Sequence, residues 1–335
     1  MLIEEFLMDT PRVATVVAAL VFGLAAPIAT AQNGPVEARN PTALTLGRVR
    51  ALVVAPHPDD ATMGAGGLIQ RIIKTGGSVR VVQITGGDAL PKGVVTINHL
   101  TTPPTTGAYR TYGSVREQEA VHAMHRLGVH RNQVSLLGFP DEGLCELAST
   151  HRAGQPFESP YTKRDAPPDP QQILPGTMYR GEDMVRELSH LLVEIRPTLV
   201  VMPSSGDLHP DHCAAHLMVH DALDDAIRNG LRPPRVLHYL VHYPKWPTAN
   251  TVEHIDPPGD NLSHDWSWKT LELTPAERAA KHRALAAFES QMLVMADFLK
   301  SFERSNELFI EGEPALPIPC WCSGQNIVPG KRTVH

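Results

Sequence analysis

The chain has 335 residues, of which 42% are hydrophobic and 20% charged, and 36 acidic against 30 basic residues give a formal net charge of −6. This composition is typical of a globular protein with one large domain or two small ones. The acidic balance and the lack of a long basic run argue against nucleic acid as a partner.

The first 31 residues have the layout of an export signal. Arg12 precedes an apolar run at residues 13–26, and the tripeptide at 29–31 has the small-x-small form of a cleavage site. Three acidic residues stand before Arg12, where a signal normally carries positive charge, and initiation at Met8 would remove two of them. A membrane anchor is the alternative, but the apolar run is shorter than the roughly 20 residues that cross a bilayer. We therefore predict an exported protein, periplasmic or extracellular, without a stable transmembrane anchor.

The chain that follows alternates between two kinds of segment. Short β-branched apolar runs bounded by Gly, Pro or Asn are typical of strands buried on both faces. We expect such strands at residues 51–55, 79–84, 134–137, 199–202 and 236–241. We expect helices between and after them at residues 62–75, 114–127, 181–195 and 211–229. The alternation predicts a Rossmann-like α/β fold, in which a mostly parallel sheet is flanked by helices.

Two long connections and a C-terminal helical region complete the predicted elements. The connections at residues 86–113 and 139–180 both leave the carboxyl edge of the sheet, where long loops usually build a pocket. Thr274, Pro275 and Glu277 have the order of an N-cap, a first helical residue and a capping-box acid. We expect C-terminal helices from there to about residue 303.

Two clusters of histidine and aspartate indicate a split metal site. His57, Asp59 and Asp60 follow the strand at 51–55, so they should lie on the turn at its carboxyl end, where α/β sheets bind ligands. The second cluster, with the sequence His-Pro-Asp-His, occupies residues 209–212. Together His57, Asp60 and His212 would supply three protein ligands and leave one position open, as in a catalytic zinc site. Other divalent ions stay open, because a His₂Asp set accepts several.

The other side chains of these clusters suggest acid–base groups. Asp59 stands beside a ligand and would be available as the general base that takes a proton from water. His209 is expected to face the same cavity and to stabilise an oxyanion. Asp211 would hold the His209 ring and favour its imidazolium form, as the carboxylate of a hydrolytic triad does.

The chain resembles the PIG-L/LmbE-like de-N-acetylases, zinc-dependent enzymes that remove acetyl groups from N-acetylglucosamine-type sugars. Both His/Asp clusters carry the resemblance, which spans roughly residues 48–311 in the order of the family. Further matching residues are Gly64-Ala65-Gly66-Gly67, Arg116, Glu119, Phe139-Pro140-Asp141, Ser290-Gln291, Glu307 and Phe309. The implied division is a signal peptide at 1–31, a linker at 32–47, a deacetylase domain at 48–311 and a tail at 312–335.

The resemblance implies an enzyme that removes an acetyl group from an N-acetylated amino sugar or glycoconjugate. It implies the same three metal ligands, Asp59 as base and His209 as oxyanion group, and it adds Arg116 and Asp141 as residues of the substrate pocket. Two positions depart from the family. Ala61 stands where a glutamate is common, which would lower metal affinity or turnover if that glutamate orients ligands. Asp207 stands where some relatives have a proton-donating tyrosine, so product protonation would fall to Asp59 or His209.

The same residues also allow simpler interpretations. His216 and His220 follow His212 at intervals of four, but three such ligands on one helix would span about 12 Å, too far for one ion, so we expect His216 to be a core residue. The glycines at 64–67 lack the third Gly of a dinucleotide fingerprint and indicate close contact between helix and sheet. Arg116 is explained equally well as a surface cation paired with a glutamate of its own helix. Asp141 is equally well explained as a turn former.

The sequence is also compatible with two other functions, and it suggests one disulfide. A metal-dependent hydrolase of another bond, and a secreted sugar-binding or zinc-binding protein without activity, are the alternative functions. The four cysteines do not have the spacing of a structural zinc site. In an oxidising compartment the segment containing Cys320 and Cys322 could form one disulfide with Cys145, which would leave Cys213 buried beside His212.

Overall fold

The computed structural model describes residues 42–247, 253–259, 266–312, 320–322 and 325–327. The expected signal peptide, most of the linker and most of the tail lie outside these residues. Within the described part, no helix combines the length and the apolar character that crossing a bilayer requires.

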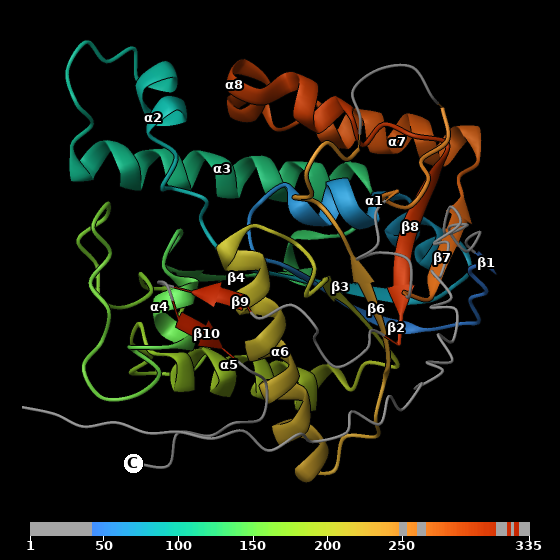
Figure 1. The fold of residues 1–335 in the computed structure, drawn as a ribbon, viewed down its shortest axis with the longest axis horizontal. Helices are drawn as coiled ribbons and strands as arrows, with labels where there is room; N and C mark the ends of the chain where they lie inside the picture. The colour runs from blue at the N-terminus through green and yellow to red at the C-terminus, as the bar shows by residue number, and fades with distance from the viewer. Residues whose placement is uncertain (1–41, 248–252, 260–265, 313–319, 323–324, 328–335) are drawn as a thin grey trace, which may run out of the picture. The chain divides into compact units, whose positions relative to one another are not determined.

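An eight-stranded sheet forms the centre of the fold (Figure 1), with the strand order β1-β7-β8-β6-β5-β2-β3-β4. Its strands are β1 (Thr42–Ala43), β2 (Arg50–Ala55), β3 (Ser78–Thr85), β4 (Val134–Phe139), β5 (Leu199–Pro203), β6 (Arg235–Tyr239), β7 (Trp268–Glu272) and β8 (Asn306–Glu311). β2 to β6 are parallel neighbours, whereas β8 pairs antiparallel with β6 and β7. All five expected strands are present, and the mostly parallel α/β fold is confirmed.

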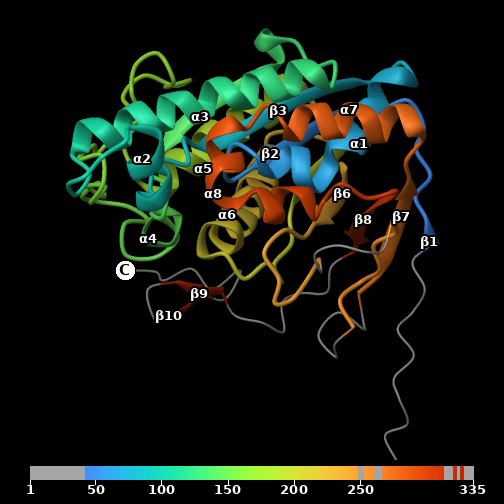
Figure 2. The ribbon, with the colours of Figure 1, turned by 90° about the horizontal axis from the view of Figure 1, so that it is seen from above.

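Helices cover both faces of this sheet. On one side lie α1 (Asp60–Lys74), α3 (Thr106–Arg126), α7 (Pro275–Leu285) and α8 (Glu289–Lys300), and on the other α4 (Leu144–Ala148), α5 (Gly181–Ile195) and α6 (Pro210–Arg228). Figure 2 shows the first layer from above, with the short α2 (Pro91–Ile97) packed against α3 and α8. A separate antiparallel pair is formed by β9 (Cys320–Cys322) and β10 (Gln325–Ile327).

The alternation of side chains along each strand divides the interior into two cores. Val53 and Val201 join the core under α1 and α7, whereas Val54 and Met202 join the core over α5 and α6. Gly64 lets α1 approach the sheet closely, since a Cβ atom at this position would lie 2.6 Å from the Tyr239 ring. The expected contact between helix and sheet is therefore confirmed at Gly64.

The structure contains several elements that were not expected. The connection at 86–113 contains α2 and the first turns of α3, which begins after Thr105, whose hydroxyl accepts a hydrogen bond from the Ala108 amide. The connection at 139–180 contains α4, and the end of the expected linker contributes β1. The capping box at Thr274 is present, but the helices that follow end at Lys300, before β8.

Candidate metal centre

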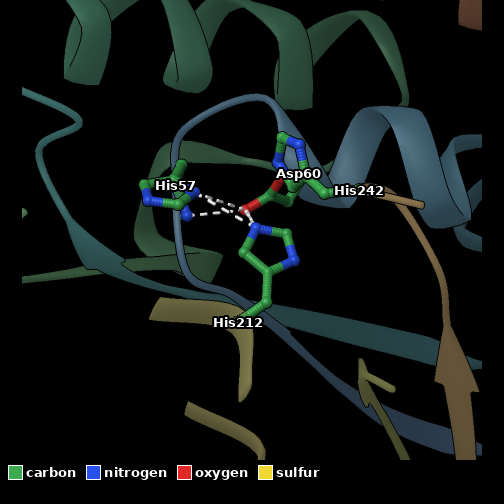
Figure 3. Close-up of side chains that lie close together, drawn as sticks. All are labelled: His57, Asp60, His212 and His242. Atoms are coloured by element: carbon green, nitrogen blue, oxygen red, sulfur yellow. Dashed lines mark hydrogen bonds and ion pairs between the residues drawn. The ribbon is translucent and has the colours of Figure 1, made fainter. Parts of the chain in front are cut away.

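The carboxyl edge of the sheet brings the two His/Asp clusters together. His57 lies on the turn after β2, Asp60 is the first residue of α1, and His212 lies in the first turn of α6, the helix that follows β5. β2 and β5 are parallel neighbours in the sheet, so the segments that leave them meet at one edge. Figure 3 shows the His57, Asp60 and His212 side chains pointing toward one another.

The donor atoms of these three side chains are spaced like the ligands of one ion. His57 Nδ1 lies 3.3 Å from Asp60 Oδ2, and His212 Nε2 lies 3.0 Å from the same oxygen. The two ring nitrogens are 3.2 Å apart. Ligands about 2.0–2.2 Å from a tetrahedral zinc ion stand about 3.3–3.6 Å from one another, close to the spacing of these atoms, so the residues present fit the metal. The expectation that these three side chains converge is confirmed.

A carboxylate holds the second nitrogen of each ligand imidazole. His212 Nδ1 lies 3.0 Å from Asp207 Oδ2, and His57 Nε2 lies 3.1 Å from Asp141 Oδ1. Asp207 Oδ2 also accepts hydrogen bonds from the amides of Val241 and His242. Such partners orient metal-binding imidazoles and increase their basicity. Asp207, which stands where some relatives have a tyrosine, is thus placed to orient a ligand.

His242 is a fourth donor that the sequence analysis missed. One of its ring nitrogens lies within 4.8 Å of the donor atoms of His57, Asp60 and His212, and Figure 3 shows it beside Asp60. Its ring stacks on Phe298 with centroids 5.2 Å apart. Its position directly after the predicted strand at 236–241 was the available signal, because this strand also ends at the carboxyl edge.

Asp59 is buried and paired with Arg116. Arg116 Nη2 donates to Asp59 Oδ1 over 3.1 Å, and Nη1 donates to the Gly87 carbonyl over 2.6 Å. Burial raises the pKa of Asp59 above its usual value, although the Arg116 charge acts in the opposite direction. Arg116 is itself buried, and Glu119 instead accepts hydrogen bonds from Ser290. The interpretation of Arg116 as a surface cation is therefore wrong.

His209 lies beside the three ligands, with its ring centroid 4.6 Å from that of His57. Its Nδ1 accepts a hydrogen bond of 3.2 Å from the Asp211 amide. Burial and the neighbouring His57 lower the pKa of His209 to about 2, so the ring is neutral. A neutral imidazole that accepts at Nδ1 carries its proton on Nε2.

The expected role of Asp211 as the carboxylate that holds His209 is wrong. Its two carboxylate oxygens accept hydrogen bonds from the amides of Leu144 and Glu142 instead, at 3.0 and 2.7 Å. The remaining contact of Asp211 is with His57, whose Nε2 lies 3.5 Å from Oδ2. The imidazolium form expected for His209 therefore lacks the counter-ion assigned to it, although the Glu142 carboxylate lies 3.6 Å from its Nε2.

Asp141 does more than form a turn. Its Oδ2 accepts a hydrogen bond of 2.6 Å from the Ala89 amide while Oδ1 contacts His57. Burial acts to raise the pKa of Asp141, but the contacts with His57 outweigh it and lower the value to about 2. The substrate-pocket role expected for Asp141 and Arg116 stays a prediction.

Buried carboxylates outnumber buried guanidinium groups in the described residues around this site. Five carboxylates are buried with one guanidinium, that of Arg116; they belong to Asp59, Asp60, Asp141, Asp207 and Asp211. Burial acts to lower the pKa of His212, but Asp207 and Asp60 outweigh it and raise the value to about 9. The carboxylates that hold a proton on His212 also attract metal cations. A bound metal ion would displace that proton. Two imidazoles and one carboxylate suit zinc better than magnesium or calcium.

The cysteines differ from expectation in one respect. Cys145 in α4 and Cys213 in α6 are both disulfide-bonded. The expectation that Cys213 remains a thiol is therefore wrong. The side chains of Cys320 and Cys322 lie outside what the structure describes.

Comparison with known proteins identifies the family. The family model described as PIG-L, GlcNAc-PI de-N-acetylase, matches residues 52–223, just over half of the chain. A deacetylase of 1D-myo-inositol 2-acetamido-2-deoxy-alpha-D-glucopyranoside from Salinispora arenicola is 28% identical over 223 residues, which are 65% of this chain and 63% of that protein. A second deacetylase of that name, from Catenulispora acidiphila, is 26% identical over 288 residues, 78% of this chain and 86% of that protein. The match covers about three fifths of the length of the first relatives.

A solved structure supports the architecture. A deacetylase of the teicoplanin biosynthesis pathway is 19% identical and has a TM-score of 0.50, with 78% of this chain and 96% of that chain covered. This likeness concerns the fold alone. The family match over residues 52–223 shows that the chain belongs to the PIG-L family of de-N-acetylases.

Proposed function

We propose that the protein is a zinc-dependent hydrolase that removes the acetyl group from an N-acetylated amino sugar or glycoconjugate. The observation that carries the proposal is the set of three donor atoms, from His57, Asp60 and His212, which lie 3.0–3.3 Å from one another. Family membership supports the reaction class. The names of the curated relatives describe an acetamido sugar joined to an inositol, which supports the substrate class.

In this proposal each side chain has a separate task. His57, Asp60 and His212 would hold the metal, which supplies Lewis acidity at this position when bound. Asp59 takes a proton from the attacking water at Oδ2, while Arg116 holds Oδ1. Its raised pKa suits a carboxylate that must both accept and return a proton. Asp59 then delivers the proton to the amine nitrogen of the leaving sugar.

His209 completes this arrangement as a neutral donor. Its Nδ1 is occupied by the Asp211 amide, so the Nε2–H is available for the oxygen that becomes negative when water attacks the acetyl carbonyl. Arg116 and Asp141 would act on substrate binding through Asp59 and His57, whose side chains they hold.

The base assignment is tested with Asp59→Asn. We expect this variant to keep zinc and to release acetate about 10²–10⁴-fold more slowly, the usual contribution of a general base. Asp224→Asn, at an exposed position of α6, is the matched control and should keep full activity. Acetate release from N-acetylglucosaminyl inositol and N-acetylglucosamine, and zinc content, are measured on the same samples. Full activity of Asp59→Asn contradicts the base assignment, and no acetate from zinc-loaded wild type contradicts the function.

His242 favours a second candidate function. If His242 is a fourth protein ligand, the site is closed like a structural zinc site, and the protein binds zinc without hydrolysis. The absorption spectrum of the cobalt-substituted protein separates the two candidates. A spectrum that responds to added acetate indicates an open position, whereas an unresponsive tetrahedral spectrum that changes in His242→Ala supports the closed site.

We also propose that the protein is exported. The disulfide-bonded state of Cys145 and Cys213 supports an oxidising compartment, and the signal-like residues 1–31 support the route. N-terminal sequencing of protein recovered outside the cytoplasm should begin near Gln32. Recovery of the full-length chain in the cytoplasm with reduced cysteines contradicts export.

A further inference from the structure

A second group of histidines lies further along α6, outside the candidate metal centre. His216 and His220 lie one turn apart on α6, and His238 lies on β6. One donor nitrogen of each is within 4.8 Å of those of the other two. The ring centroids are 4.6, 5.2 and 5.8 Å apart, so the three imidazoles contact one another. Figure 1 shows α6 crossing the sheet beside β6.

His238 occupies a position where this fold normally places an apolar side chain. It pairs in register with Met202 of β5, whose side chain belongs to the core over α5 and α6. Its neighbours Leu237 and Tyr239 face the opposite core. His238 is 3% exposed and His216 is 6% exposed. Two imidazoles are thus buried with ring nitrogens within 4.8 Å of that of a third, a spacing that allows the three to share one ion.

The hydrogen bond of His216 fixes its tautomer. Its Nδ1 lies 3.1 Å from the carbonyl oxygen of Pro203, which can only accept, so Nδ1 carries the proton. The lone pair of the ring therefore belongs to Nε2. A backbone carbonyl that holds one ring nitrogen while the other carries the lone pair is the usual arrangement of a metal-binding histidine.

We propose that His216, His220 and His238 bind a second transition-metal ion, Zn²⁺ in the first place. Three imidazoles without a carboxylate suit zinc, copper, nickel and cobalt, and they do not suit magnesium or calcium. Two of the ligands stand at positions i and i+4 of one helix, where side chains share a face. The third comes from the strand beside that helix, so the ion would join α6 to β6.

This site is distinct from the one proposed for hydrolysis. His212 precedes His216 by one turn, about 6 Å along the helix axis. The His212 ring is held between Asp60 and Asp207, two carboxylates that take no part in the second group. The second ion would stabilise the helix whose first turn carries His212, and the inference does not depend on the hydrolytic activity.

Metal content of the full chain tests the proposal. After loading with zinc and dialysis, we expect two equivalents in the wild type and one in His220→Ala, which keeps full acetate release per remaining zinc. His216→Asn should also hold one equivalent, because the asparagine amide can replace the Nδ1 donor to Pro203 but not the Nε2 ligand. His125→Ala, at an exposed position of α3, is the control and should hold two. One equivalent in the wild type, or two in both ligand variants, overturns the proposal.

Thermal unfolding isolates the second site from the first. In His212→Ala, added zinc should still raise Tm by several degrees, since the second group remains intact. The same addition to the double variant His212→Ala/His220→Ala should leave Tm unchanged. A double variant that shifts as much as His212→Ala, or a His212→Ala protein that does not shift, shows that the three imidazoles are packing residues only.

Discussion

Two networks of buried charge in this protein differ in their balance. At the carboxyl edge of the sheet, five buried carboxylates lie beside the guanidinium of Arg116 and the imidazoles of His57 and His212. Between α1, α7 and β8, each buried carboxylate has a cation of its own. Glu307 accepts from Lys281 over 2.6 Å and from the Gly67 amide over 2.7 Å. Glu277 is paired with Arg71 through two hydrogen bonds of 2.7 Å.

The network of Glu307 and Glu277 stabilises the fold by itself. The network at the carboxyl edge of the sheet is suited to binding a cation. Buried charges are tolerated when partners satisfy them, and a surplus of one sign raises the free energy of the folded state. The network of Glu307 is complete within the chain. At the sheet edge burial acts to lower the pKa of His57 and His212, but the carboxylates outweigh it, raise the pKa and so hold protons on these imidazoles. A divalent cation between His57, Asp60 and His212 would take the place of those protons.

The largest expected effect on the free energy of unfolding comes from disrupting the ion pair of Glu307 and Lys281. Glu307→Gln removes the negative charge beside Lys281 and leaves its ammonium with neutral acceptors such as the Met63 carbonyl, at 2.7 Å. We expect a loss of about 3–5 kcal/mol in the free energy of unfolding, measured by urea denaturation. The double variant Glu307→Gln/Lys281→Met should regain part of this loss. A single variant as stable as the wild type would show that the pair does not support the fold.

Removal of metal tests the network at the carboxyl edge of the sheet, around His57, Asp60 and His212. A chelator should lower the free energy of unfolding by about 2.7 kcal/mol per site, if the free metal was a hundredfold above its Kd. Thermal unfolding with and without the chelator measures the change. Glu307→Gln should show the same decrease from its own starting point, because its network contains no metal. Equal stability of the loaded and stripped wild type would contradict the comparison.

A smaller effect is expected at Asp207, which holds the Nδ1 of His212. Asp207→Asn removes the negative charge but keeps a side chain of similar shape. We expect zinc affinity to fall about 10–100-fold, as is usual when the carboxylate behind a metal-binding histidine is lost. Competition with a chromophoric chelator measures the affinity, with Asp224→Asn as the control. Unchanged affinity would mean that the backbone alone positions His212.

The smallest effect depends on pH and concerns Glu277. Burial acts to raise its pKa, but the hydrogen bonds from Arg71 outweigh burial and lower it from 4.5 to about 2. A lowered folded-state pKa stabilises the protein above pH 4.5, and this contribution disappears as the pH falls toward 2. Arg71 is partly exposed, so we expect Glu277→Gln to cost about 1 kcal/mol at pH 7. Urea denaturation at pH 7 and pH 3 should show the difference between variant and wild type shrinking; a constant difference would contradict the assignment.

Local patterns were sufficient for much of the fold and for the three metal ligands. β-Branched runs such as residues 199–202 predict buried strands wherever they stand, because both faces of a parallel strand are covered. His57 and Asp60 follow directly after one such strand and His212 begins the helix after another, so the carboxyl edge of the sheet could be predicted to gather them. β7 and β8 were missed because their mixed polar and apolar residues lack a long apolar run.

Side-chain direction could not be obtained from local patterns. Asp211 lies two residues from His209, yet its carboxylate turns to the amides of Glu142 and Leu144, which arrive from a connection about 70 residues earlier. Arg116 pairs with Asp59 across two elements and not with a glutamate of its own helix. Each choice depends on which distant groups need a partner once the chain is packed.

By itself, the amino-acid sequence determined the family, the order of strands and helices, and the clusters at residues 57–60 and 209–212, because each depends on residues close together in the chain. Only the tertiary structure decided that His242 joins the first cluster and that His238 joins His216 and His220. Both histidines come from the end of the chain segment that forms β6. The residues that surround them depend on the position of β6, which lies beside β5 and packs against α6. The order of strands in a sheet is set only when the whole chain is packed.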